Sequence, residues 1–217
     1  MRGKYINIKI FQPDEALKTR ITNAALDQFL QLGIRYITMR RIVDPLGIST
    51  KTVYKYFNDK EDLLRHCLIK HYTLLSRDYF EMEKNIVNPL IILSLGWEKA
   101  LNLDFGVNHI FYHDLNYYYP DIQDSVLKKI FKKSKSLQIR LIQDGISEGY
   151  LRKDIIPEMI LEVFDILYVS ITRTRHFEKF KRKPEVILDQ TIHNYLKGLC
   201  TEKGLKELNL HISNYKS

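Results

Sequence analysis

The chain has 217 residues, 45% of them apolar and 28% charged, a balance that excludes an intrinsically disordered protein and predicts a buried core. Only 9 Gly and 6 Pro are present, which disfavours an all-β fold with many turns. The net charge is +8, and residues 1–60 hold 11 Lys and Arg against 5 Asp and Glu. This basic first quarter indicates an anionic partner, with nucleic acid favoured over a membrane, although charge alone does not separate a binding face from plain solvated surface.

Neither a membrane span nor a secretion signal is predicted. No apolar run approaches the roughly 20 residues that cross a bilayer, and the N-terminus lacks the apolar core of a signal peptide. Cys67 and Cys200 stand alone, without CxxC spacing. These features predict reduced, buried cysteines in a cytoplasmic protein.

The first predicted helix follows a loose head at residues 1–13. Apolar residues recur at helical spacing from Leu17 to Leu32. Asp14 precedes this run as a candidate N-cap, and Gly33 follows it as a candidate left-handed C-terminal residue. The segment therefore predicts one amphipathic helix between these two residues.

Two short helices are predicted next, joined by a tight turn. Thr38 suits the N-cap of the second helix, which Pro45 and Gly47 prevent from running far. The third helix begins at Ser49 and turns Val53 inward. Two short helices joined by a Gly-containing turn are typical of a helix-turn-helix, whose second helix enters the DNA major groove.

The remainder of the chain also has the pattern of helices. Asp59 and Asp62 resemble a capping box at the start of a long fourth helix. Longer helices are predicted at residues 59–83, 89–103, 107–118, 122–148, 157–176 and 185–200. No strand alternation or internal repeat is found, so the predicted fold class is all-α.

The stretch GISTKTVYKYF, residues 47–57, covers the third helix. Its residues divide into those expected in the core and those expected on the surface. Val53 and Phe57 face inward in the predicted helix. The residues left outside carry groups that meet base edges or phosphates: Thr50, Lys51, Thr52, Tyr54 and Lys55. Thr38 and Lys60 begin the flanking helices, where free backbone N–H groups favour anions. The alternative is a solvated amphipathic helix with an aromatic core edge.

These residues belong to a longer pattern. The stretch from Thr19 to Leu64 has an Ala-Ala…Phe helix, a Gly, a Thr that opens helix two, and then G-I-S…V-Y-K-Y-F-x-x-K-E-x-L-L. Over about residues 17–65 the chain resembles the N-terminal domain of the TetR/AcrR family of transcriptional regulators. The resemblance implies a homodimer with a three-helix DNA-binding domain at residues 1–62 and a helical effector-binding and dimerisation domain at residues 63–217.

The resemblance also implies DNA contacts. Contacts with phosphates are expected at Thr38, Ser49, Tyr54, Tyr56 and Lys60. Contacts with bases are expected at Thr50, Lys51 and Thr52. Two residues depart from the usual family pattern: Pro45, where helix two usually continues, and Lys51, where many members have a small residue.

For the C-terminal part, the resemblance implies a dimer and a ligand pocket. The helices at about 157–176 and 185–200 would form the four-helix bundle of the homodimer, which their broad apolar surface also favours. The candidates to line the pocket are Trp97, Phe105, His109, Tyr112, His113, Tyr117 and Tyr118. Aromatic residues at helical spacing more often belong to a core, and this alternative stays open.

Catalytic and metal sites are not predicted. His109 and His113 lie four residues apart, but HIFYHD lacks the Glu of HExxH and has no obvious third ligand. No GxGxxG, P-loop or GxSxG motif is present, so neither an enzyme nor a cofactor is expected.

The sequence therefore predicts a dimeric, sequence-specific DNA-binding regulator. A repressor that a small-molecule effector releases from a palindromic operator is favoured. The alternative is a DNA-binding protein without such an effector, either architectural or controlled by a protein partner. An enclosed cavity in the C-terminal domain would favour the first, and a filled core the second.

Overall fold

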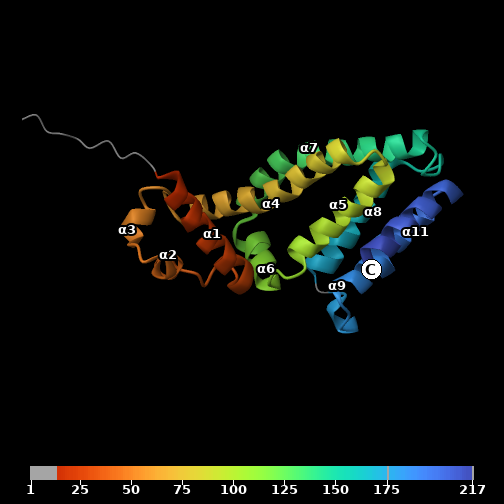
Figure 1. Ribbon diagram of the computed structural model, residues 1–217. Coiled ribbons are helices and arrows are strands. Elements are labelled where there is room, and N and C mark those ends of the chain that lie inside the picture. The colour runs from red at the N-terminus through yellow and green to blue at the C-terminus, as the bar shows by residue number, and fades with distance from the viewer. Residues whose placement is uncertain (1–13, 175, 217) are drawn as a thin grey trace, which may run out of the picture.

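In a computed structural model that describes residues 14–174 and 176–216, the chain is built from helices, and this part contains no β-strand (Figure 1). The predicted all-α fold class is confirmed. The loose head predicted at residues 1–13 lies outside the described residues. The helices are α1 (Glu15–Leu32), α2 (Met39–Val43), α3 (Thr50–Val53), α4 (Lys60–Asn85), α5 (Pro89–Asp104), α6 (His109–Tyr118), α7 (Pro120–Ser147), α8 (Pro157–Thr172), α9 (Pro184–Leu188), α10 (Asn194–Leu199) and α11 (Glu202–Lys216).

The predicted N-caps of the first four helices are confirmed by hydrogen bonds. The Asp14 carboxylate accepts from the backbone N–H of Ala16 at 2.9 Å. Thr38 and Ser49 accept from the N–H three residues on, at 3.2 Å and 3.1 Å. Asp59 accepts from the Asp62 N–H at 2.7 Å, but Asp62 accepts in return from Asn58 rather than Asp59. The predicted capping box is therefore only partly formed, because the side chain of Asp62 accepts from the N–H of Asn58, one residue before the predicted partner Asp59.

Gly33 ends α1, but the predicted left-handed conformation is wrong. Its φ is 83° and its ψ is 171°, an extended backbone with positive φ that is nearly restricted to glycine. A Cβ at this position would lie 2.5 Å from Cγ2 of Ile110 and 3.0 Å from Oδ2 of Asp114. Both the backbone and the close approach of α6 therefore require glycine.

Helix α2 ends through a tighter turn that accommodates Pro45. The chain continues from α2 into a 3-10 turn at Asp44–Leu46, in which the missing N–H of Pro45 is not needed. Gly47, with φ 64° and ψ 27°, ends this turn in the left-handed conformation. This turn sets α3 at an angle to α2, as a helix-turn-helix requires.

Two apolar clusters form the core. The first joins α1–α3 and the start of α4 to α6 and α7, and it contains Phe29, Phe57 and Phe111. The second lies among α5, α7, α8 and the C-terminal helices, and it contains Trp97 and Phe164. The predicted boundary between residues 62 and 63 falls in the first turn of α4, which continues beside α7 (Figure 1). A continuous helix thus connects the N-terminal head (residues 14–59) to the rest of the molecule.

The prediction of one continuous helix at residues 185–200 is wrong. The segment is divided into α9, a π-helical turn at Asp189–His193, and α10. The helix predicted at 157–176 ends at Thr172. Helix α11 was not predicted, because its sequence is mainly polar and contains Gly204, a poor helix former. Gly204 is needed there, since a Cβ would overlap the carbonyl oxygen of Tyr150.

Candidate functional site

Helix α3 lies at the end of the molecule away from α8 and α11 (Figure 1). Val53 and Phe57 are buried in the head core and hold the inner face of this segment. The Ser49 hydroxyl caps the helix and also lies 2.9 Å from the Thr52 hydroxyl. The outer face of α3 is therefore fixed by an apolar anchor on one side and a polar cap at its start.

The predicted DNA-contacting residues all lie on the head, with different degrees of exposure. Five are exposed: Thr38, Ser49, Lys51, Tyr54 and Lys55. Four are half-buried: Thr50, Thr52, Tyr56 and Lys60. Tyr54 is 53% exposed although it is aromatic and follows a buried valine. A large aromatic side chain held in solvent beside two lysines is suited to contact a phosphate backbone.

Two of the half-buried residues have intramolecular partners. The Tyr56 ring packs against the head core, and its hydroxyl accepts from the Asp14 N–H at 3.4 Å. The Lys60 ammonium donates to the carbonyl oxygen of Ile34 at 2.6 Å. Burial lowers the pKa of Lys60, and nearby Asp114 opposes this shift. The side chain of Lys60 therefore stabilises the α1–α2 connection, which leaves its backbone N–H as the group for a phosphate.

Sequence reasoning missed basic and aromatic residues outside α3. Arg40 and Arg41 are exposed in α2, and Tyr36 is 74% exposed just before it. In a helix-turn-helix the first helix crosses the DNA backbone, so exposed residues of this kind are candidates for phosphate contacts. The signal was available in the sequence as the pair Arg40-Arg41 directly after the Thr38 cap.

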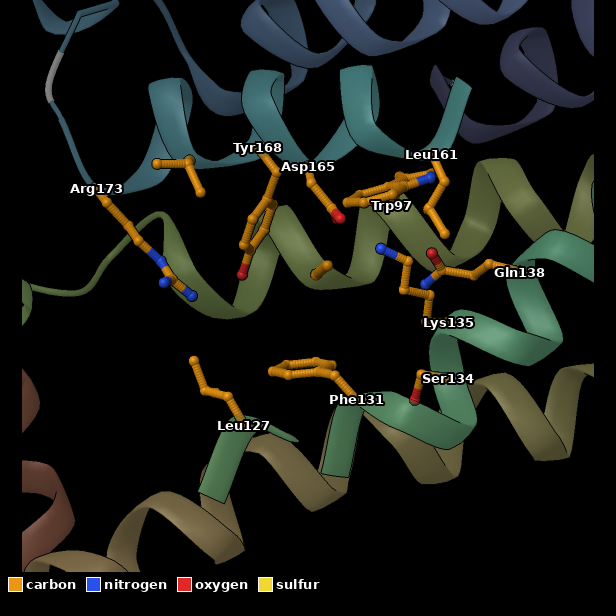
Figure 2. A pocket seen from close by; sticks show the side chains of 12 residues that line it. Trp97, Leu127, Phe131, Ser134, Lys135, Gln138, Leu161, Asp165, Tyr168 and Arg173 are labelled. Carbon is orange, nitrogen blue, oxygen red and sulfur yellow. The ribbon is translucent and has the colours of Figure 1, made fainter. Parts of the chain in front are cut away.

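A cavity of about 240 Å³ lies in the C-terminal domain among α5, α7 and α8 (Figure 2). Its walls are mainly apolar and include Trp97, Phe131 and Leu161. Three charged residues also line it: Lys135, Asp165 and Arg173. Burial raises the pKa of Asp165, while Lys135 opposes that shift.

Of the predicted pocket residues, only Trp97 lines this cavity. Tyr112 is buried below the Arg173 guanidinium, whose Cζ lies 5.0 Å from its ring centroid. His109, His113 and Tyr117 line a separate, open groove that also reaches Arg173. The remaining two lie elsewhere: Phe105 packs against the second core, and Tyr118 contacts Arg35 of the head. Six of the seven predicted residues therefore lie outside this cavity, and five of them belong to α6, which packs against the head.

His109 and His113 do not gather further ligands. Within the part of the chain that the structure describes, no group of three or more His, Cys, Asp or Glu side chains could hold a metal ion. The His113 ring instead stacks on Tyr117, with centroids 5.9 Å apart.

Helix α6 is fastened to the head by polar contacts that the sequence did not reveal. The Asp114 carboxylate is buried and accepts from the backbone N–H groups of Ile34 and Arg35, both at 2.8 Å. The Arg35 guanidinium donates to the Tyr118 hydroxyl at 2.6 Å and lies over its ring. These contacts connect α6 directly to the segment between α1 and α2.

A second polar link joins α4 to the cavity wall. His71 of α4 lies 2.8 Å from Oδ1 of Asp104, a buried residue at the end of α5. Oδ2 of Asp104 accepts from the hydroxyl of Tyr168, which lines the cavity. The cavity and the helix that leads to the DNA-binding head thus share one hydrogen-bonded chain.

Comparison with known proteins agrees with this architecture. Residues 21–67 match the family model of bacterial regulatory proteins of the tetR family. The HTH-type transcriptional regulator SAR2658 of Staphylococcus aureus is 28% identical over 141 residues, which cover 56% of this chain and 76% of that protein. The HTH-type transcriptional repressor KstR2 of Mycobacterium tuberculosis is 23% identical over 151 residues, which cover 68% of this chain and 76% of that repressor.

Solved structures share the fold over most of the chain. KstR2 of Mycobacterium tuberculosis matches with a TM-score of 0.61 at 20% identity, over 88% of this chain and 98% of that one. FadR of Bacillus subtilis in complex with stearoyl-CoA matches with a TM-score of 0.66 at 18% identity, over 84% and 97%. The similar proteins are transcriptional regulators, not enzymes. The N-terminal motif of this chain thus matches the tetR family of bacterial regulatory proteins, and its all-helical fold is similar to that of solved transcriptional regulators.

Proposed function

We propose that the protein is a homodimeric repressor that binds a palindromic operator and is released by a small molecule in its C-terminal cavity. The observation that carries the proposal is the presence of two separate sites in one chain. The exposed polar face of α3 lies at one end, and a mainly apolar cavity lies among α5, α7 and α8. Operator binding requires the protein to act in the cytoplasm, where the DNA is.

DNA recognition is assigned to the exposed start of α3. Thr50, Lys51 and Thr52 would meet base edges in the major groove, and Tyr54 and Lys55 would contact phosphates. Thr38, Ser49, Tyr56 and Lys60 would add phosphate contacts from the helix starts and the edge of the head. The two copies of α3 in a dimer would enter successive major grooves about 34 Å apart.

The dimer is assigned to the outer face of α8. Met159, Ile166 and Val169 lie on one side of this helix and are 63%, 57% and 37% exposed. Val186 of α9 is also 43% exposed. Such an apolar strip on a helix favours burial against a second copy of the same strip. The interface would thus use α8 and α9. Both overlap the ranges of about 157–176 and 185–200 that the sequence predicts for the dimer.

The cavity favours control by a small molecule over control by a protein partner. A regulator without an effector has no need for unfilled space, since close packing stabilises a core. A ligand releases the operator only if it binds more tightly to the spacing of heads that does not fit DNA. The α6–head contacts through Asp114 and the α4–cavity chain through His71 are the two routes by which such a difference would reach the heads.

Selection from a pool of random duplexes tests this proposal. The bound sequences are expected to contain an inverted repeat whose half-site centres lie about one helical turn apart. Binding to the selected site should weaken steeply as salt rises, because each neutralised phosphate contributes a slope of about 0.9 log unit per decade. A pool without an inverted repeat, or a flat salt response, would contradict operator binding by a dimer.

A further inference from the structure

Arg173 is a cation at the cavity wall whose Nε has no hydrogen-bond partner within the described residues. It follows the last turn of α8, and its guanidinium lies 5.0 Å from the Tyr112 ring centroid and 5.8 Å from that of Tyr168. Its Nε is buried and has no hydrogen-bond partner among the described residues. A buried donor without an acceptor costs about 1–3 kcal/mol. The position of Arg173 therefore invites an acceptor from outside the chain.

Two neighbouring hydroxyls are in the same condition. The Oη atoms of Tyr72 and Tyr112 are buried and have no partner within the described chain. Tyr112 lies under the Arg173 guanidinium, and Tyr72 packs edge-on against Phe131 of the cavity wall at 5.4 Å between centroids. Neither tyrosine lines the cavity, so the guanidinium of Arg173 is the group at this end of the wall that would meet a ligand with several acceptor lone pairs, such as a carboxylate.

The nearest acid does not satisfy Arg173 directly. Both oxygens of Asp104 are already engaged, Oδ1 with His71 and Oδ2 with the hydroxyl of Tyr168. Asp104 offsets part of the positive charge of Arg173 through space, and the buried Nε makes no hydrogen bond to it. The half-buried arginine is thus stabilised without a ligand and would still gain hydrogen bonds from one.

The other charges of the cavity lie toward its opposite end. Figure 2 shows Arg173 and Tyr168 at one end and Lys135 and Gln138 at the other, with Asp165 between them. Lys135 and Arg173 both act on Asp165 through space and oppose the rise of its pKa that burial causes. The cavity therefore has a guanidinium at one end, with an Nε that lacks a hydrogen-bond partner among the described residues, and a body lined mainly by apolar and aromatic side chains.

The size of the cavity limits the body of the ligand. At about 240 Å³ it exceeds the ~150 Å³ that holds a benzene molecule and falls below the ~300 Å³ at which drug-sized pockets begin. Trp97, Phe131 and Tyr168 provide flat surfaces on its wall. One aromatic ring or a chain of similar volume fits this space, together with a small polar head.

We infer that the cavity binds a small organic acid, with its apolar body against Trp97 and Phe131 and its carboxylate on the guanidinium of Arg173. The inference deepens the proposed function and rests on this cavity being the effector site. The carboxylate would also reach the end of α8 where Tyr168 connects through Asp104 to His71 of α4. Occupation by an anion would thus act next to the link between the cavity and the DNA-binding head.

Three probes with the same body and different heads test the inference without DNA. Phenylbutyrate, phenylbutanol and phenylbutylamine are titrated into the full chain by calorimetry. Phenylbutyrate is expected to bind at least about tenfold more tightly than the alcohol, because hydrogen bonds to a charged group exceed those to a neutral one. The amine should bind most weakly, since it would place a cation beside Arg173. An alcohol or amine that binds as tightly as the acid, or a protein that binds none of the probes, overturns the inference.

Two variants from the same cavity locate the anion. Arg173→Met keeps the apolar stem and is expected to bring the affinity for phenylbutyrate down to that for phenylbutanol, about a tenfold loss. The matched variant Lys135→Met removes a positive charge from the opposite end and should change the affinity less than about threefold. A larger loss in Lys135→Met than in Arg173→Met overturns the assignment. If Arg173→Met does not fold, the affinities of the three probes for the unmodified chain and for Lys135→Met still test the inference.

The ligand class and the proposed function can fail separately. Binding of phenylbutyrate in the absence of DNA tests the ligand class alone. If the acid binds at Arg173 but leaves operator affinity unchanged, the ligand class stands and the release mechanism is wrong. If operator binding is found but the acid does not bind, the regulator stands and the ligand class is wrong.

Discussion

The head and the C-terminal domain bury different kinds of side chain. Among the buried polar and charged residues that the structure describes, Thr22 is the single one in α1–α3. The C-terminal domain and the helices that lead to it bury His71, Glu98, Asp104 and His193. The head thus keeps its charges on the outside, where DNA would lie, while the other domain places charges inside, where they are expensive unless paired.

This difference explains why the two sites differ in how they work. The candidate DNA-binding face needs only a firm apolar base, since its ligand arrives from solvent and brings the opposite charge. A ligand cavity must hold polar groups ready in a region without water, and each such group needs a partner or a function. The charged groups of the C-terminal domain differ in their partners: Oε1 of Glu98 lies within hydrogen-bond distance of two histidines, whereas the buried Nε of Arg173 has no hydrogen-bond partner among the described residues.

The largest expected effect concerns the buried cluster of Glu98 and its two histidines. Glu98 of α5 is 1% exposed and lies 3.1 Å from Nε2 of His193 and 3.3 Å from Nε2 of His211 on α11. Burial alone would raise the pKa of Glu98, but the hydrogen bonds with both histidines outweigh it, and the pKa falls to about 2. Because the folded pKa lies below the usual 4.5, the charged form contributes about 3 kcal/mol above that pH, by linkage.

That contribution should disappear as the pH falls from 4.5 toward 2. Glu98→Gln is expected to lower the free energy of unfolding at pH 7 by about 3 kcal/mol and to flatten its acid dependence, as measured by urea unfolding. The exposed Glu81, which pairs with Lys84 on α4, offers the matched control, and Glu81→Gln should leave the unfolding curve unchanged. Equal curves for the two variants would show that the buried cluster does not stabilise this domain.

A smaller effect is expected at the head, and it concerns binding rather than stability. Lys51→Ala should weaken binding to the selected operator by about 1–3 kcal/mol and relax its sequence preference, with little change in unfolding. Fluorescence anisotropy with operator and random duplexes measures both quantities. Lys99→Ala, an exposed lysine on α5, serves as the control and should change neither. An equal loss on operator and random DNA would reassign Lys51 to a phosphate contact.

The sequence predicted the head well because local rules determine it. The caps at Asp14, Thr38 and Ser49 each act within three residues, so the pattern alone identifies them. The sequence could not show that the Lys60 ammonium turns inward, because its acceptor belongs to Ile34 in another part of the chain. The sequence also could not show the backbone conformation of Gly33, because the helix that approaches this glycine, α6, is distant in the sequence.

The C-terminal site could not be predicted for the same reason. Trp97, Phe131 and Arg173 come from three helices that no short motif connects. The aromatic run of α6 suggested a pocket, but its Asp114 and Tyr118 fasten that helix to the head. Helix α11 could not be predicted, because Gly204 is a poor helix former. This glycine is required by close packing against the backbone of Tyr150, which the sequence does not reveal.

The central claim is that occupation of the cavity and binding of DNA are thermodynamically linked. The most direct measurement is the affinity for the selected operator with and without saturating phenylbutyrate. Weaker binding by about fivefold or more in its presence is predicted for the unmodified chain, with no change in Arg173→Met. An operator affinity that does not depend on the occupied cavity would contradict the account.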